Sequence, residues 1–218
     1  MTGVQGLGLA LAYLIGAVPV GLTVGLLLGT DPRKVGSGNI GATNVLRALG
    51  PGIGLSVFIA DVLKGVGAVA LCAAFGLEGW LLSMGALFAV LGHCFSVFIG
   101  FKGGKGVATS LGGVIMLSPL AAAIAFAVWL VTVLPTRIVS LASLLGALTL
   151  PIAFYALHTA NPDSVVPLAA MAVVVIGRHH ENIERILRGE ESRFGGSKNQ
   201  PDEPAADTQA HTGEAEEG

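Results

Sequence analysis

The fold of this chain is decided by residues 4–28, which read VQGLGLALAYLIGAVPVGLTVGLLL. These 25 positions contain no charged side chain, and an α-helix needs about 20 apolar residues to cross a bilayer. The residues before them include no basic region and no obvious cleavage site, unlike a secretory signal peptide. We therefore expect residues 4–28 to form a first membrane-spanning helix.

Similar apolar runs recur along the chain, and the composition agrees with them. Hydrophobic residues make up 53% of the 218 positions and charged residues only 12%, which is typical of an integral membrane protein and excludes an ordinary soluble domain. The 32 glycines favour close helix packing in lipid. The sequence predicts an all-α, polytopic bundle of about seven membrane helices, some short or re-entrant, over residues 4–28, 53–75, 80–100, 107–134, 138–157 and 165–177.

The run at 107–134 is expected to supply two of these helices. It is too long for a typical single span, and Gly112-Gly113 and Ser118-Pro119 interrupt it. Two short segments that meet near Ser118-Pro119 would bring the chain back to the side from which it came. The sidedness of the rest is the same whether this pair crosses the membrane fully or only re-enters it.

Lysine and arginine are distributed unevenly between the apolar runs. They cluster at 33–47, 102–105, 137 and 178–198, whereas the connections at 76–79 and 158–164 contain none. By the positive-inside rule, the basic segments face the cytoplasm. The sequence thus predicts that the N-terminus lies outside and that any site built from the basic segments faces the cytoplasm.

The first basic segment contains a glycine-rich stretch, GSGNIGATNVLR, at residues 36–47. Its three glycines allow backbone N–H groups to converge on an anion, and Ser37 and Thr43 add hydroxyl donors. Arg47 supplies a cation suited to bidentate contact with phosphate. The glycine spacing also matches the dinucleotide fingerprint, but that motif follows a β-strand, whereas a membrane segment precedes this one. A flexible connection between helices would explain the glycines but not the asparagines or Arg47.

The second basic segment reads GHCFSVFIGFKGGKGVAT at residues 92–109. Glycines around Lys102 and Lys105 permit an anion to approach both the backbone and the ammonium groups, although the spacing is not that of a Walker A loop. Lipid-headgroup anchoring is the alternative for these lysines, and the density of glycine argues against it. His93, about two turns earlier, is either a catalytic group or a hydrogen-bonded packing residue.

The third basic segment, RHHENIERILRGEE, covers residues 178–191. Helical spacing places Arg178, Asn182 and Arg185 on one face. An amphipathic helix lying on the membrane surface is an alternative interpretation of the same pattern. His179 and His180 are adjacent, so they diverge on a helix and do not predict a metal site.

These three segments, in this order, resemble the acyl-phosphate:glycerol-3-phosphate acyltransferase family of bacterial membranes. The resemblance extends to about residue 195. It departs from the family pattern at Ser96, where the family has proline, and at Glu190, where the family has threonine, so Glu191 is the matched glutamate. The resemblance implies candidate catalytic roles for His93, Asn44 and His179, and substrate or phosphate binding by Ser37, Gly38, Asn39, Thr43, Arg47, Lys102, Gly103, Gly104, Lys105, Thr109, Arg178, Asn182 and Glu191.

The implied reaction moves a fatty acyl group from acyl phosphate to the 1-hydroxyl of glycerol 3-phosphate, which gives lysophosphatidic acid and phosphate in the first acylation of phospholipid biosynthesis. Acyl phosphate is already activated, so neither an acyl-enzyme nor a cofactor or metal is expected, and positioning and charge stabilisation would carry much of the barrier. The general base is His93, His179 or a phosphate oxygen of the donor. The implied partners are glycerol 3-phosphate, acyl phosphate from a soluble or peripheral phosphate acyltransferase, and membrane lipids, with no nucleic acid.

Two pairs of polar residues lie outside these segments. Asp61 and Lys64 fall within the second predicted span, where their i, i+3 spacing lets them pair, and we expect them to support the structure or the site. His158 and Asp163 fit the His-x4-Asp pattern of a different glycerolipid acyltransferase group. The predicted topology places this pair on the outer face, away from the basic segments, so we interpret it as a chance match.

A membrane transporter for a phosphorylated small solute is the competing class of function. It would need polar groups near the middle of the bilayer and access from both sides. The polar motifs of this chain gather on one side instead, which favours an enzyme at the membrane surface.

The last residues differ in composition from the rest. Six of the 14 acidic residues lie in 201–218, which contains no lysine or arginine. We therefore expect residues 1–195 to form a single transmembrane acyltransferase domain and residues 196–218 to form a disordered, acidic cytoplasmic tail. The resemblance places the protein in the bacterial inner membrane.

Overall fold

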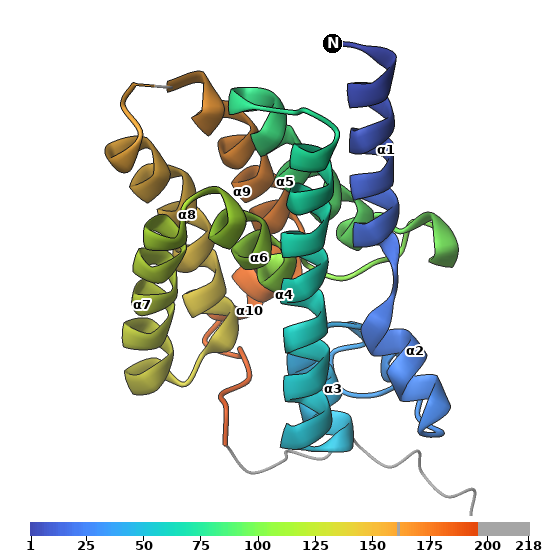
Figure 1. The fold of residues 1–218 in the computed structure, drawn as a ribbon. Helices are drawn as coiled ribbons and strands as arrows, with labels where there is room; N and C mark the ends of the chain where they lie inside the picture. Colours follow the sequence, from blue (N-terminus) through green and yellow to red (C-terminus); the bar gives the residue numbers. More distant parts are fainter. Residues whose placement is uncertain (161, 196–218) are drawn as a thin grey trace, which may run out of the picture.

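The computed structural model describes residues 1–160 and 162–195, and these are helical or irregular, without a strand. The predicted tail at 196–218 lies outside the described residues. Figure 1 shows the helices in chain order. They are α1 (Gly3–Ala17), α2 (Val20–Leu27), α3 (Ala42–Leu49), α4 (Pro51–Ala74), α5 (Gly79–Cys94), α6 (Val107–Leu117), α7 (Pro119–Thr136), α8 (Val139–Leu157), α9 (Val165–Gly177) and α10 (His180–Leu187), with 3-10 turns at Pro32–Lys34, Val97–Ile99 and Pro162–Ser164.

Five helical stretches are long and apolar enough to cross a membrane, and two further apolar helices are shorter. This confirms the prediction of an all-α bundle with about seven membrane segments, some of them short. The five long stretches are Gly3–Leu27, Pro51–Ala74, Gly79–Ile99, Pro119–Thr136 and Val139–Leu157, and the shorter two are Val107–Leu117 and Pro162–Gly177.

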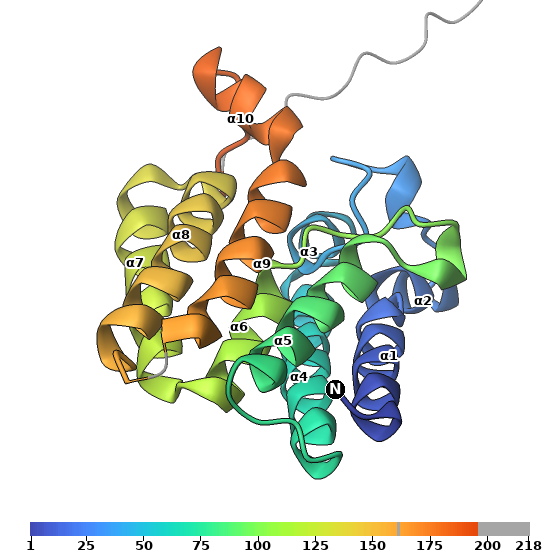
Figure 2. The same ribbon diagram turned by 90° about the horizontal axis from the view of Figure 1, so that it is seen from above.

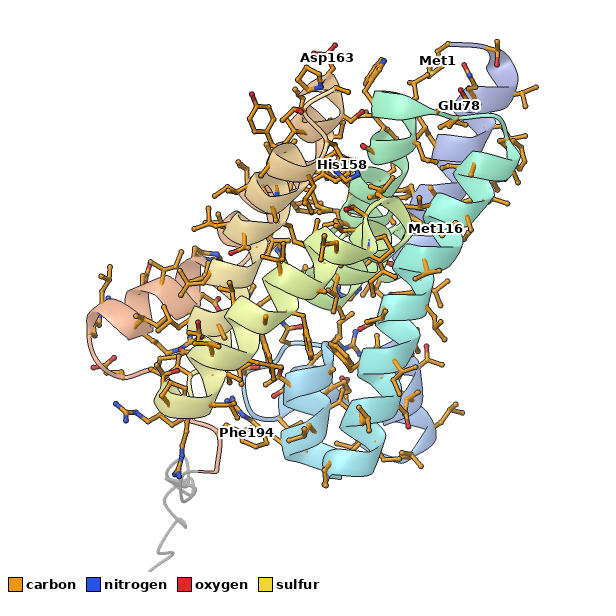
Figure 3. All side chains as sticks on the ribbon, turned by 60° about the vertical axis from the view of Figure 1, so that its left-hand side comes forward. Met1, Glu78, Met116, His158, Asp163 and Phe194 are labelled. Atoms are coloured by element: carbon orange, nitrogen blue, oxygen red, sulfur yellow. The ribbon has the colours of Figure 1, made fainter. Side chains whose placement is uncertain are left out.

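The run at 107–134 is divided at the predicted point. α6 ends at Leu117 and α7 begins at Pro119, with the Ser118 hydroxyl accepting a hydrogen bond from the Ala121 N–H at 3.4 Å. A helix of 11 residues is about 16 Å long at 1.5 Å per residue, roughly half of a bilayer's hydrocarbon core. Figure 3 accordingly shows Met116 farther from the upper end of the molecule than Glu78, His158 and Asp163.

The first span differs from the prediction of one continuous helix over residues 4–28. It is broken between Ala17 and Val20, because Pro19 has no N–H to continue the helical hydrogen bonds. Polar side chains from α4 and from the segment after α5 bind the carbonyls freed by the break. Lys64 donates to the oxygens of Gly16 and Val18, and Ser96 donates to Ala17 O at 2.5 Å.

The bundle is arranged around α5, which packs against α1, α4, α6 and α9. Seen along the bundle, α7 and α8 form one flank and α1 and α2 the other (Figure 2). In Figure 3, Met1, Glu78, His158 and Asp163 lie at one end of the molecule and Phe194 lies at the opposite end. The structure therefore separates the His158–Asp163 pair from the C-terminal motif, as the distribution of basic residues predicts.

Candidate active site at the basic end of the bundle

The loop before α3 is held in shape by one asparagine. Asn44 is buried, and its side-chain oxygen accepts from Ser37 N–H at 2.9 Å. Its amide nitrogen lies within 3.1 Å of three backbone oxygens, those of Pro32, Val35 and Asn39. Both ends of the side chain are thus committed to the loop, so the geometry assigns Asn44 the shaping of this loop, and its predicted catalytic role stays untested.

Polar groups of the first motif line the outer surface of this loop. Ser37, Gly38 and Arg47 are exposed, and Asn39 and Thr43 are partly so. The side-chain oxygen of Asn39 accepts a hydrogen bond from the Gly41 N–H at 2.8 Å. Among the residues that the structure describes, Arg47 has no hydrogen-bonding or ion-pairing partner. Its guanidinium is therefore available to an anion.

The second motif folds back onto the end of α5. The Gly103 N–H donates to Cys94 O at 3.1 Å, and the Gly104 N–H donates to His93 O at 3.0 Å. Arg178, at the end of α9, clamps the same two glycines by donating to Gly103 O at 2.8 Å and Gly104 O at 3.1 Å. Its guanidinium also lies over the Phe95 ring. Arg178 thus fixes this loop, and its predicted contact with substrate phosphate stays a prediction.

His93 lies directly beneath this loop, in a buried polar cluster. Its Nδ1 is 3.2 Å from Lys64 Nζ and 3.3 Å from the Thr109 hydroxyl. Asp61 is paired with Lys64 at 2.9 Å, which confirms the predicted pair, and is 3.7 Å from His93 Nδ1. The predicted residues His93, Thr109 and Gly104 are therefore brought together, and Asp61 and Lys64 support them from α4.

The third motif is joined to the second through a network centred on Glu191. The Lys105 ammonium donates to the side-chain oxygen of Asn182, whose amide donates to Glu191 at 2.6 Å. Arg185 and Ser140 each donate to the same carboxylate at 2.7 Å. Burial favours the neutral acid, but these hydrogen bonds and the charge of Arg185 outweigh it and lower the pKa of Glu191.

Lys105 and Lys102 differ in their surroundings. Burial and the neighbouring Arg185 charge lower the pKa of Lys105, because both disfavour its charged form. An anion bound beside it would relieve that cost. Lys102 is exposed at the start of the same loop, where its ammonium is open to an incoming ligand.

His179 is buried next to this network and has a defined tautomer. Its Nδ1 lies 2.7 Å from Val175 O. A carbonyl oxygen only accepts, so Nδ1 carries the proton, and in the neutral ring Nε2 keeps a free lone pair. Burial lowers the pKa of His179 to about 4, against the hydrogen bond to Val175, which raises it. His179 is thus a neutral group able to accept a proton at Nε2.

Acidification is expected to destabilise the protein through His179. In the unfolded chain His179 takes up a proton near pH 6.5, but in the folded protein only near pH 4. The free energy of unfolding is therefore highest above pH 6.5 and falls as the pH drops toward 4. Between pH 6.5 and 5 the loss is about 2 kcal/mol, at ~1.4 kcal/mol per unit. Thermal unfolding in detergent should show a smaller loss for His179→Gln than for the unmodified protein. His180→Gln, an exposed neighbour, is the control, and equal losses in all three would contradict the assignment.

A cavity of about 60 Å³ lies on the other side of α6 from the polar cluster. It is lined almost wholly by apolar side chains from α4, α6, α7, α8 and α9. Val107 and Ser110, which border it, flank Thr109, whose hydroxyl lies beside His93. The lining includes Phe58, Val107, Leu111, Phe126, Trp129 and Leu150.

Not every residue of the site was predicted. Ser140 was missed, because it lies 51 positions from its partner Glu191 and no local pattern marks it.

The first motif is separate from the other two in the hydrogen bonding of the described residues. Within this part of the chain, no hydrogen bond links the 36–47 loop to them, although Figure 1 shows α3 and α10 both in the half of the molecule away from the N-terminus. His158 stacks on Phe154 at 4.3 Å, at the other end of the bundle.

Fold and site together define a polytopic membrane protein with glycine-containing, basic segments gathered toward one end and an apolar cavity bordered by α6, which follows the second of these segments. Residues 6–189 match the family model described as glycerol-3-phosphate acyltransferase. The chain belongs to the glycerol-3-phosphate acyltransferase family and is a membrane acyltransferase.

Individual relatives agree along most of the chain. The glycerol-3-phosphate acyltransferase of Thermus thermophilus is 48% identical over 187 residues, which cover 86% of this chain and 94% of that one. The enzyme of the same name from Aquifex aeolicus is 47% identical over 186 residues, which cover 84% and 95%.

Two crystal structures of PlsY (YgiH), an integral membrane glycerol 3-phosphate acyltransferase, share the fold. The glycerol 3-phosphate form matches with a TM-score of 0.84 at 43% identity, and covers 88% of this chain and 96% of that one. The lysophosphatidic acid form matches with a TM-score of 0.81 at 42% identity over the same shares.

Proposed function

We propose that this chain transfers a fatty acyl group from acyl phosphate to the 1-hydroxyl of glycerol 3-phosphate, at the cytoplasmic face of the bacterial inner membrane. The observation that carries this proposal is that the 102–105 loop, with its two lysines and the Arg178 guanidinium bound to Gly103, leads directly into α6, whose first residue borders an apolar cavity. An acyl phosphate has the matching layout, with a phosphate head and a hydrocarbon chain. The solved relatives with glycerol 3-phosphate and lysophosphatidic acid support the acceptor and the product.

The two phosphates would be bound by different motifs. Lys102, Lys105 and the backbone of the second motif face the donor, since the apolar cavity begins beside Val107. The exposed Ser37 and Arg47 of the first motif bind the phosphate of glycerol 3-phosphate. The cavity holds only part of a long acyl chain, and the remainder lies in the surrounding lipid.

In the reaction, the acceptor hydroxyl oxygen attacks the acyl carbonyl carbon, and the bond from that carbon to the phosphate oxygen breaks. The hydroxyl proton passes to a base, and inorganic phosphate leaves. We assign the base to His179, because its Nε2 lone pair is free and its neutral form persists at physiological pH. Asn182 and Glu191 hold Lys105 and the third motif in place. The acyl phosphate itself comes from a soluble or peripheral phosphate acyltransferase.

The donor class is tested with purified protein in liposomes. Given glycerol 3-phosphate and palmitoyl phosphate, the protein should form lysophosphatidic acid and release one phosphate per product. A protein that uses only palmitoyl thioesters would overturn the proposed donor while leaving the acyltransferase class intact.

Arg47→Ala should reduce kcat/KM for glycerol 3-phosphate by about 10- to 150-fold. A charge-assisted hydrogen bond is worth roughly 1.5–3 kcal/mol, and about 1.4 kcal/mol is tenfold. The loss should fall on the KM for glycerol 3-phosphate, with little change in the thermal midpoint. Arg188→Ala is the matched control. Arg188 is an exposed arginine whose ion pair with Glu184 is a long surface contact of 3.9 Å, so its loss should change neither binding nor stability. A folded Arg47→Ala variant with unchanged kinetic constants would remove Arg47 from the site.

His158→Ala and Asp163→Ala should each keep acyl transfer within about twofold of the unmodified rate. Both residues lie at the end of the bundle away from the basic loops, beyond hydrogen-bond reach of a substrate held there. The measurement is acyl-phosphate-dependent turnover in the same liposomes. A collapse of activity in either folded variant would reverse the proposed location of the site.

A further inference from the structure

The ammonium group of Lys64 is saturated by three hydrogen-bond acceptors. Nζ lies 3.1 Å from Gly16 O, 2.8 Å from Val18 O and 3.2 Å from His93 Nδ1. A lysine ammonium has three donors and no acceptor, so each donor has its own partner. Asp61 supplies the balancing charge at 2.9 Å, but its Oδ1 has no hydrogen bond of good geometry.

This arrangement fixes the proton of His93. Because Lys64 only donates, His93 Nδ1 must accept, and a neutral imidazole that accepts at Nδ1 carries its proton at Nε2. The Thr109 hydroxyl, 3.3 Å from Nδ1, is a second potential donor to the same atom. Asp61 Oδ1, at 3.7 Å, is beyond hydrogen-bond distance and so does not hold a proton on Nδ1.

The Nε2–H of His93 points at the second motif and has no partner among the described residues. A Cβ placed on Gly104 would lie under 3.0 Å from Nε2, so the ring edge is directly against the Gly104 backbone. The side chain is 93% buried, since its relative exposure is 7%. Among the described residues, the fully enclosed side-chain polar atoms without a partner are Asp61 Oδ1 and Ser83 Oγ. Nε2 of His93 is not one of them, so it keeps some exposure and its N–H is open to a ligand that accepts a hydrogen bond.

We propose that His93 donates a hydrogen bond from Nε2 to an oxygen of the acyl donor, and that Lys64 is the positioning residue that holds His93 in this tautomer. The inference rests on the proposed function for the identity of the donor. The place fits, because Nε2 lies against the backbone of Gly104, in the loop that carries Lys105. This loop runs directly into α6, whose first residue, Val107, borders the apolar cavity. A ring with its proton at Nε2 cannot accept another there, so His93 is not the general base.

The tautomer can be observed without any substrate. The chain has five histidines, so long-range proton–nitrogen spectra of protein labelled with 15N-histidine, in detergent, remain interpretable. The resonances lost in His93→Gln identify His93. We expect an unprotonated Nδ1 and a protonated Nε2, and the reverse pattern would overturn the proposal. A protein that fails to use acyl phosphate would contradict the proposed function and leave this result unaffected.

Three substitutions separate donation from proton acceptance. His93→Gln places an amide N–H near the position of Nε2, His93→Asn places it near Nδ1, and His93→Ala places none. Removing a donor to a developing oxyanion costs about 10²- to 10³-fold. We expect losses of that size for His93→Ala and His93→Asn, and a loss of no more than about tenfold for His93→Gln. A folded His93→Gln protein as inactive as His93→Ala would rule out donation, as would a loss confined to the KM for glycerol 3-phosphate.

The role of Lys64 is tested with both charges of the pair removed, in Lys64→Met with Asp61→Asn, so that no buried charge is left alone. If Lys64 sets the tautomer, the His93 nitrogen resonances should shift toward a mixture of both tautomers and kcat should fall about tenfold. The KM for glycerol 3-phosphate should stay the same. Unchanged His93 resonances in the folded double variant would show that Lys64 does not position the ring.

Discussion

Gly104→Ala is expected to lower acyl transfer at least about 100-fold. The added Cβ would lie under 3.0 Å from His93 Nε2, a separation that real Cβ atoms essentially never show. The ring cannot retreat, because Lys64 and Thr109 hold its other edge at 3.2 and 3.3 Å. The loop cannot retreat easily either, since Arg178 binds the carbonyls of Gly103 and Gly104. The methyl group would therefore occupy the space that the ligand needs.

The measurement is kcat/KM for acyl phosphate, together with a thermal midpoint of the purified protein. Gly67→Ala is the control, because a Cβ there meets nothing within 4 Å and alanine favours a helix by about 1 kcal/mol over glycine. The control should keep full activity and a midpoint at least as high. A Gly104→Ala protein with near-normal kcat/KM would show that the loop moves freely away from His93.

Much of the fold is predictable because length and apolar character determine what can cross a bilayer. The interruption at Ser118-Pro119 was predicted because 28 apolar residues exceed one span and proline begins helices more readily than it continues them. The break at Pro19 was missed, since an uncharged run of 25 residues satisfies the length requirement with or without a kink. What stabilises that break is a lysine 46 positions away from the Val18 carbonyl.

The motifs of the site can be predicted from the sequence, but the tertiary contacts of several of their residues cannot. Arg178 and Asn44 are polar residues in polar motifs, and the resemblance implies substrate binding by Arg178 and a catalytic role for Asn44. In the structure both side chains bind backbone groups of the loops, which composition and spacing cannot show. The tautomers of the two histidines likewise depend on one neighbour each. Val175 O accepts from His179 Nδ1, and Lys64 donates to His93 Nδ1. Tautomers depend on such tertiary contacts, so the sequence left the base open.

Gly92→Ala is expected to be the most destabilising single substitution considered for this protein. A Cβ on Gly92 would fall under 3.0 Å from Tyr13 O and Ala17 N, both of them backbone atoms of α1 or its end. Gly16 makes the reciprocal approach to the backbone of Ala89 on α5. Helices in lipid associate by this kind of close packing between small residues, so α1 and α5 would have to move apart.

The separation would also remove polar contacts across the same interface. Tyr13 donates to Phe95 O at 2.6 Å, and Lys64 reaches both the α1 break and His93, the neighbour of Gly92. We expect a loss of more than about 4 kcal/mol, which places the change among the exceptional ones. The thermal midpoint in detergent should fall by about 10 °C or more, on the basis of 2–4 °C per kcal/mol. Gly146→Ala is the matched control, a buried helical glycine whose nearest neighbour would be 3.6 Å from the new Cβ, and it should unfold near the unmodified midpoint. If Gly92→Ala and Gly146→Ala have the same thermal midpoint, the close contact between α1 and α5 does not make the expected contribution to the stability of the bundle.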